Sequence, residues 1–236
     1  MATEPASGAG RWGAYAFAAV AAAFLVRMWA LQYAGLNLDE CSFIVQAGLV
    51  ASGTRLYGGT LCQHMPFDVM AIHPLAALGL LKDPAPYRLL VATAQASAAL
   101  LLALSPVFKE KRVWGWGAGI GYLLIYAGLA TLLKGHVYSG YALAGAAWVV
   151  SFSLLGLPLV LGQVPSRAQA FVGGAAYAVW ALSSPALGIA SIFYLAACAF
   201  APGLRGKTTT CGFAWGASRS AACTSLSIAC DRPNAS

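Results

Sequence analysis

The chain has 236 residues and a formal net charge of +7, and 60% of its residues are apolar while only 9% are charged. A water-soluble domain usually carries about 25% charged residues, because its surface must be hydrated. So few charges exclude most soluble enzymes and disordered chains, and basic residues scattered between apolar blocks exclude a nucleic-acid binder. The composition predicts an all-α, multi-pass helix bundle in membrane lipid, with its basic residues in short loops.

Several apolar regions are long enough to cross a bilayer, which takes roughly 20 residues of helix. Full spans are predicted, in chain order, at about 14–34, 87–108, 113–133 and 140–161. The first is interpreted as an uncleaved span rather than a signal peptide, because no good cleavage site follows it. A last apolar region, about 170–201, contains Ser183-Ser184-Pro185, and the proline favours two short helices over one long helix.

The apolar segment Phe67–Leu81 is short for a span and is interpreted as a re-entrant or interfacial helix. A true short span with an inverted later topology stays open. If this segment does not cross the membrane, the cytoplasmic side carries Arg11, the cluster 109–112 and Arg167. The external loop 36–66 then faces the opposite side, and the bundle has about five to seven membrane helices.

The C-terminal tail differs from the rest of the chain. Residues 1–205 form the predicted transmembrane module, whereas residues 206–236 are rich in Ser, Thr, Ala and Cys and show no helical or strand period. We interpret this tail as irregular sequence outside the fold, arising from truncation or a shifted reading frame, or as a disordered natural tail. The six cysteines include no C-x-x-C pair, so a zinc or redox site has no support.

Two of the seven acidic residues, Asp39 and Glu40, are adjacent and follow the first span. Neighbouring carboxylates repel each other, and lipid nearby disfavours their charged forms, so the pair is costly unless it binds a cation or transfers a proton. Apolar residues spaced by three or four predict an interfacial amphipathic helix over 41–51, with the acids at its N-terminus. An equally weighted explanation is that the two acids only stabilise the N-terminus of this helix, where negative charge is favourable.

The order of motifs after the acidic pair is informative. Gly53–Tyr57 and His64-Met65-Pro66 follow it and lead into the short apolar segment. This order resembles the first external loop of the GT-C superfamily of membrane glycosyltransferases. The resemblance is to the branch of the dolichyl- and polyprenyl-phosphate-mannose protein mannosyltransferases and the bacterial aminoarabinose transferases. The later run Asp83–Arg88 is similar to that family's polar link carrying an arginine.

The resemblance extends over about residues 11–202 and includes departures. Met65 replaces a usual Lys, Phe67 replaces a Pro, and Ser184 stands where a Lys is common. Those basic groups face phosphate in the relatives, so their loss puts donor binding or donor choice in question. The relatives are also longer, and the chain corresponds to their N-terminal module.

The resemblance implies transfer of a sugar from a polyprenyl-phosphate donor, as co-substrate, to an acceptor glycan, lipid or protein on the outer or lumenal face, with inversion. Asp39 would be the general base, and Glu40 would orient the acceptor or hold a divalent cation, Mg or Mn, near the donor phosphate. The substrate-binding residues that it implies are Arg55, Tyr57, His64, Arg88 and His136. The implied location is a bacterial inner membrane or the endoplasmic reticulum.

Two alternatives stay open. One is a non-catalytic polytopic membrane protein, either a transporter-like bundle or an assembly subunit. Acids at helix ends and in loops, rather than near the midplane, weigh against transport. The other is an inactive fragment with the family's fold, which the lost basic residues and the tail make realistic.

Overall fold

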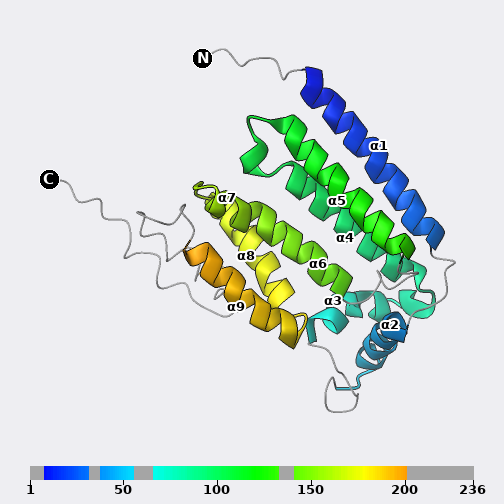
Figure 1. Ribbon diagram of the computed structural model, residues 1–236. Coiled ribbons are helices and arrows are strands. Elements are labelled where there is room, and N and C mark those ends of the chain that lie inside the picture. Colours follow the sequence, from blue (N-terminus) through cyan, green and yellow to red (C-terminus); the bar gives the residue numbers. More distant parts are fainter. Residues whose placement is uncertain (1–7, 32–37, 56–65, 133–140, 201–236) are drawn as a thin grey trace.

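The computed structural model describes residues 8–31, 38–55, 66–132 and 141–200, and every regular element in them is a helix (Figure 1). The all-α prediction is therefore confirmed for this part of the chain. The helices are α1 (Gly8–Ala30), α2 (Leu38–Ala51), α3 (Pro66–Ala77), α4 (Ala85–Ala103), α5 (Arg112–Leu132), α6 (Tyr141–Ser151), α7 (Leu157–Val160), α8 (Arg167–Ala181) and α9 (Pro185–Ala199). Two 3-10 turns, Leu80–Lys82 and Pro106–Phe108, and a π-helical segment, Phe152–Gly156, join some of them.

The long helices form one row. In space their order is α1, α5, α4, α6, α8 and α9, each packed against the next, while α2 and α3 pack together at one end of the row (Figure 1). α1 and α5 run parallel, because Gly13 packs against Trp116 and Phe24 contacts Tyr126 further along both helices. The N-termini of α1 and α5 therefore lie at the same end of the row.

Glycines set the close approach of α4 and α5. A Cβ atom at Gly115 would collide with the backbone oxygen of Ala103, and one at Gly119 would lie 2.8 Å from that of Ala99. The intervening Gly117 has open space around its Cα. Small residues four apart thus bring the two antiparallel backbones into contact, as they do in membrane helix pairs.

Buried polar side chains connect α4 with its neighbours. Gln95 is 1% exposed, donates to the carbonyl oxygen of Ala142 at 2.6 Å and accepts a hydrogen bond from Tyr122. Ser105 donates to the carbonyl oxygen of Ser153 at 2.8 Å. The partners advance together along the two chains, from Gln95 and Ala142 to Ser105 and Ser153, so α4 and the rod that begins with α6 are parallel.

The predicted span at 140–161 is one continuous rod, although not a uniform one. α6 passes through the π-helical segment into α7, where Pro158 lies. Proline cannot donate the usual hydrogen bond, and its ring clashes with the carbonyl four residues earlier. The wider π turn directly before it accommodates both effects.

The predicted interruption of the last apolar region is confirmed. α8 ends at Ala181 and α9 begins at Pro185, with the Ser184 side chain accepting from the backbone N–H of Leu187 at 3.4 Å. Tyr177 of α8 donates to the carbonyl oxygen of Ser191 in α9, so the two helices fold back on each other.

Three helices in the described part of the chain are long and apolar enough to cross a membrane: α1, α4 and the rod over Ala142–Val160. Large apolar side chains on the outside of the bundle agree with a lipid-facing surface; Ile125, Phe171 and Phe193 are each at least 60% exposed. α3 has 12 residues and contains Pro74, so at 1.5 Å per residue it is only about 18 Å long. These lengths support an integral membrane protein.

The helix directions define the two ends. The N-termini of α1, α5 and α8 share one end, which we call the basic end; its described basic residues are Arg11, Lys109, Lys111, Arg112 and Arg167. The opposite end, the site end, carries α2, α3, the start of α4 and the turn 182–184 between α8 and α9 (Figure 1). The predicted sharing of one side by Arg11, 109–112 and Arg167 thus agrees with this geometry.

Candidate functional site

Helix α2 presents one buried face to the bundle. Glu40, Phe43 and Ala47, spaced by three and four residues, are each at most 1% exposed. This is the pattern expected of an amphipathic helix, and the helix predicted over 41–51 is confirmed, beginning three residues earlier. The acidic pair lies in its first turn, as predicted, and Glu40 is one of the residues on the buried face.

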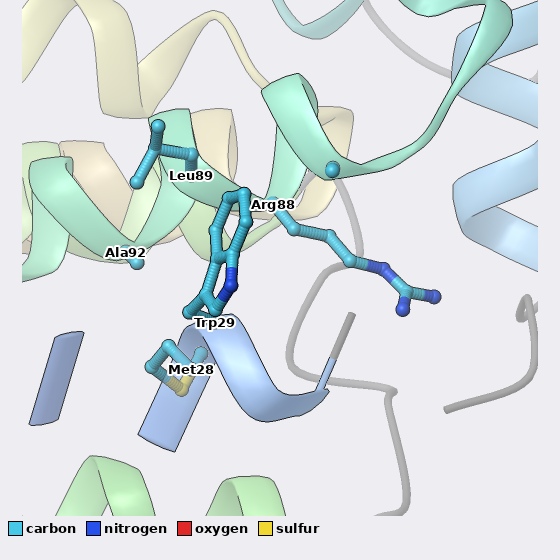
Figure 2. A pocket seen from close by; sticks show the side chains of 6 residues that line it. Met28, Trp29, Arg88, Leu89 and Ala92 are labelled. Atoms are coloured by element: carbon cyan, nitrogen blue, oxygen red, sulfur yellow. The ribbon is translucent and has the colours of Figure 1, made fainter. Parts of the chain in front are cut away.

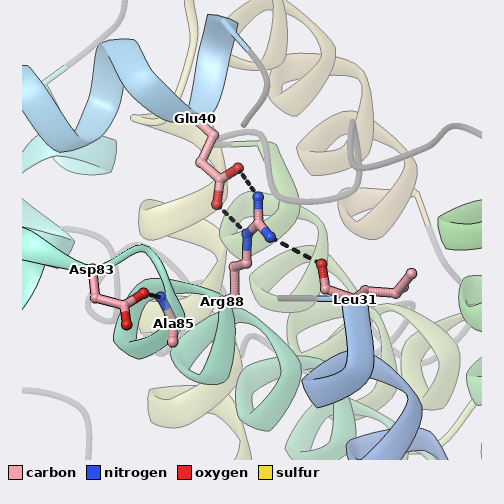
Figure 3. Close-up of polar contacts among 5 residues, drawn as sticks. All are labelled: Leu31, Glu40, Asp83, Ala85 and Arg88. Atoms are coloured by element: carbon pink, nitrogen blue, oxygen red, sulfur yellow. Dashed lines mark hydrogen bonds and ion pairs between the residues drawn. The ribbon is translucent and has the colours of Figure 1, made fainter. Parts of the chain in front are cut away.

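The first turn of α4 places an arginine opposite this face. The Asp83 carboxylate accepts from the backbone N–H of Ala85 at 2.8 Å, and the backbone N–H of Arg88 bonds the carbonyl oxygen of Pro84 at 3.0 Å. These contacts fix where α4 begins (Figure 3). The Arg88 side chain is only 2% exposed, which is rare for a charged residue unless it is paired.

Arg88 and Glu40 form a buried, two-pronged ion pair. Arg88 Nε donates to Glu40 Oε1 at 2.6 Å, and Arg88 Nη2 donates to Glu40 Oε2 at 2.7 Å. Arg88 Nη1 donates to the carbonyl oxygen of Leu31 at 2.9 Å (Figure 3). One guanidinium therefore joins the end of α1, the start of α2 and the start of α4.

The low polarity of the surroundings makes this pair interdependent. Charges buried without a partner are strongly unfavourable, while a well-oriented fork on a carboxylate satisfies both groups. Loss of either side chain would leave a buried charge that water cannot reach. The pair therefore favours one arrangement of α2 relative to the bundle.

A small pocket lies beside the stem of Arg88. Its volume is about 10 Å³, and it is lined by Met28, Trp29, Ala85, Arg88, Leu89 and Ala92. Figure 2 shows the guanidinium directed away from Met28 and Trp29. Such a volume holds about one water molecule and no sugar.

A larger apolar pocket lies elsewhere at the site end. It has a volume of about 280 Å³ and is lined by Gly145, Trp148, Trp180 and Leu187, from the start of α6, the end of α8 and the start of α9. No sequence pattern predicts this pocket, because its walls come from segments distant in the chain and no spacing links them. Its walls suit a hydrocarbon chain.

The structure brings two of the predicted site residues together, Glu40 and Arg88. Arg55 follows α2 and is exposed. Asp39 is the second residue of α2, and its side chain lies outside the described part. The remaining predicted residues, Tyr57, His64 and His136, also lie outside the described residues.

The described surroundings of Glu40 do not suit a divalent cation. Both of its oxygens accept from Arg88, and a cation there would compete with the guanidinium. Among the residues that the structure describes, no cluster of three or more His, Cys, Asp or Glu side chains could hold a metal ion.

Comparisons of the chain with models of protein families, with curated proteins and with solved structures find no match.

Proposed function

We propose that this chain is a membrane glycosyltransferase, or the N-terminal part of one, that transfers a sugar from a polyprenyl phosphate to an acceptor at the site end. The proposal takes α1, α4, α5, the α6–α7 rod, α8 and α9 as membrane helices. Three of them meet the length and hydropathy of a span, and the others pack between the same two ends. α2 and α3 would lie at the membrane surface, outside the hydrocarbon core.

The Glu40–Arg88 pair is the observation that carries this proposal. It ties the first turn of α2 to α1 and α4 at the site end. Asp39 directly precedes Glu40 in the same turn, so its backbone is held by the same contact. Adjacent helical residues do not face each other, which lets Glu40 serve as a positioning residue while Asp39 is kept for chemistry.

The proposed reaction uses Asp39 as general base. Its carboxylate takes the proton of an acceptor hydroxyl while the hydroxyl oxygen bonds the anomeric carbon of the donor sugar. The bond from that carbon to the phosphate oxygen breaks on the opposite face, so the centre inverts and polyprenyl phosphate leaves. Negative charge grows on the phosphate and requires a cation nearby.

The candidate phosphate ligands differ in availability. Arg55 is exposed just beyond α2, while the Arg88 guanidinium is already bound to Glu40 and Leu31. We therefore assign the phosphate to Arg55, with Tyr57, His64 and His136 as further candidates. The apolar pocket between Trp148 and Trp180 would take part of the prenyl chain.

The test is the Asp39→Asn variant. Membranes containing the overproduced chain supply native acceptors, and a panel of polyprenyl-phosphate-linked hexoses and pentoses supplies donors. Release of polyprenyl phosphate should fall by about 100-fold or more, because a carboxamide cannot take the acceptor proton. The abundance of the membrane protein should not change.

Asp83→Asn is the matched control, because it changes an exposed acid at the same end while keeping an oxygen that can accept from Ala85. It should release polyprenyl phosphate like the wild type. Equal release by the Asp39→Asn variant would refute Asp39 as base. Movement of substrate across sealed vesicles without release of polyprenyl phosphate would favour the transporter-like alternative.

A further inference from the structure

The basic end carries a concentrated positive charge that the proposed reaction does not use. Lys109 and Lys111 are exposed in the link between α4 and α5, and Arg112 begins α5 half-buried. Arg11 is exposed in the first helical turns of α1, and Glu110 is the one acid among the described residues of this end. We propose that this end binds the phosphate of an anionic phospholipid headgroup in the adjacent leaflet.

Backbone hydrogen bonds order the first part of the link that presents these lysines. The backbone N–H of Phe108 bonds the carbonyl oxygen of Ser105 at 3.0 Å, and that of Lys109 bonds Pro106 at 3.0 Å. Ser105 is fully buried and bonded to Ser153 across the bundle. Little backbone entropy is lost when an anion binds to such a turn.

Aromatic side chains place this turn at headgroup depth. Trp12 is 74% exposed, Trp114 is 70% exposed and Tyr15 is 67% exposed, and all three lie in the first turns of α1 or α5. Exposed tryptophan and tyrosine gather at the boundary between hydrocarbon and headgroups. A phosphodiester bound at this depth would be within reach of the basic side chains.

Arg112 has hydrogen-bonding capacity left over. Its Nη1 atom is buried and has no hydrogen-bond partner among the residues that the structure describes. A buried guanidinium N–H group without a hydrogen-bond partner lowers the stability of the fold. The two-pronged geometry of a guanidinium matches the oxygens of a phosphate. In the proposed site, the half-buried Arg112 would supply this unused donor to the lipid phosphate.

Brominated lipids test this assignment, since bromine quenches tryptophan fluorescence on contact. The purified full chain is placed in phosphatidylcholine vesicles that contain equal fractions of brominated phosphatidylglycerol or brominated phosphatidylcholine. Quenching should show about a threefold to fivefold preference for the anionic lipid, from the attraction of a few basic residues to the headgroup. Molar salt should weaken that preference by screening.

Two variants assign the preference to this end. The double variant Lys109→Gln/Lys111→Gln and the single variant Arg112→Gln should each reduce it, whereas Lys82→Gln, which removes one exposed charge at the site end, should leave it unchanged. Circular dichroism and gel filtration check that each variant is folded. No preference in the wild type, or a preference lost only in the site-end variant, would overturn the proposal. The outcome is independent of sugar transfer.

Discussion

At the scale of single residues, one arginine joins three segments that are distant in the sequence. Arg88 contacts Glu40, 48 residues earlier, through two hydrogen bonds and Leu31, 57 residues earlier, through one. Both charged side chains are almost completely buried. The contribution of each side chain to the free energy of unfolding therefore depends on whether its partner is present.

A double-mutant cycle measures this dependence. Glu40→Gln should lower the free energy of unfolding by about 3–5 kcal/mol, because it leaves the Arg88 cation buried without a counter-charge. Arg88→Met should cause a similar loss by leaving the carboxylate unpaired. Denaturant titration of the purified chain in detergent measures each value.

The combined variant Glu40→Gln/Arg88→Met should lose about 1–3 kcal/mol less than the sum of the single losses, because neither buried charge then remains. Asp83→Asn serves as the exposed control and should change stability by less than about 0.5 kcal/mol. Purely additive losses at Glu40 and Arg88 would show that the two side chains are not coupled.

The sequence could identify this acid but not its partner. Two adjacent carboxylates beside an apolar span are costly, which marks Asp39 and Glu40 without any structure. The resemblance implies Arg88 as a substrate-binding residue, whereas the structure shows its guanidinium bound to Glu40 and Leu31. Its pairing with Glu40 depends on how α2 folds back over α4, and no local spacing of residues encodes that.

At the scale of helices, the spacing of glycines decides how closely α4 and α5 approach. Gly115→Ala should lower the free energy of unfolding by about 1–3 kcal/mol, because the new methyl group would collide with the carbonyl oxygen of Ala103. Gly117→Ala is the matched control in the same helix. It should be neutral or stabilising by up to about 1 kcal/mol, since its methyl group meets open space.

Thermal unfolding in one detergent ranks these two variants. A Gly117→Ala variant that is less stable than Gly115→Ala would contradict the packing of α4 against α5. Glycine at alternate positions from Gly115 to Gly121 is a sequence pattern that allows close helix packing. It does not show that Gly115 and Gly119 make the contact while Gly117 does not, because that depends on the rotation of α5 about its axis.

The helices themselves were more predictable than their contacts. Long apolar runs locate α5 within one residue and α4 within five, whereas α1 begins six residues before the predicted start; Pro185 marks the start of α9, because these signals act locally. The π-helical segment before Pro158 was not predicted. A proline within a helix can be accommodated by a kink, a break or a wider turn, and neighbouring helices decide among them.

At the scale of the whole molecule, the two ends differ in chemistry. The basic end gathers Arg11, Lys109, Lys111 and Arg167, and the opposite end carries the buried Glu40–Arg88 pair. Basic residues concentrate in short cytoplasmic loops of membrane proteins. Under the proposed membrane topology, this asymmetry predicts that the site end lies on the outer or lumenal face, where lipid-linked sugars would be used.

The central claim, that the bundle crosses a membrane with its site end on one face, is tested by labelling single cysteines in sealed, right-side-out vesicles. In a chain whose six cysteines are replaced by serine, four exposed positions each receive one cysteine: Ser52, Lys82, Lys109 and Ser166. An impermeant maleimide added outside should label positions 52 and 82, and should label 109 and 166 only after the vesicles are opened. Labelling of 52 and 82 from opposite sides would show that α3 crosses, and equal labelling of all four before opening would contradict the proposed membrane topology altogether.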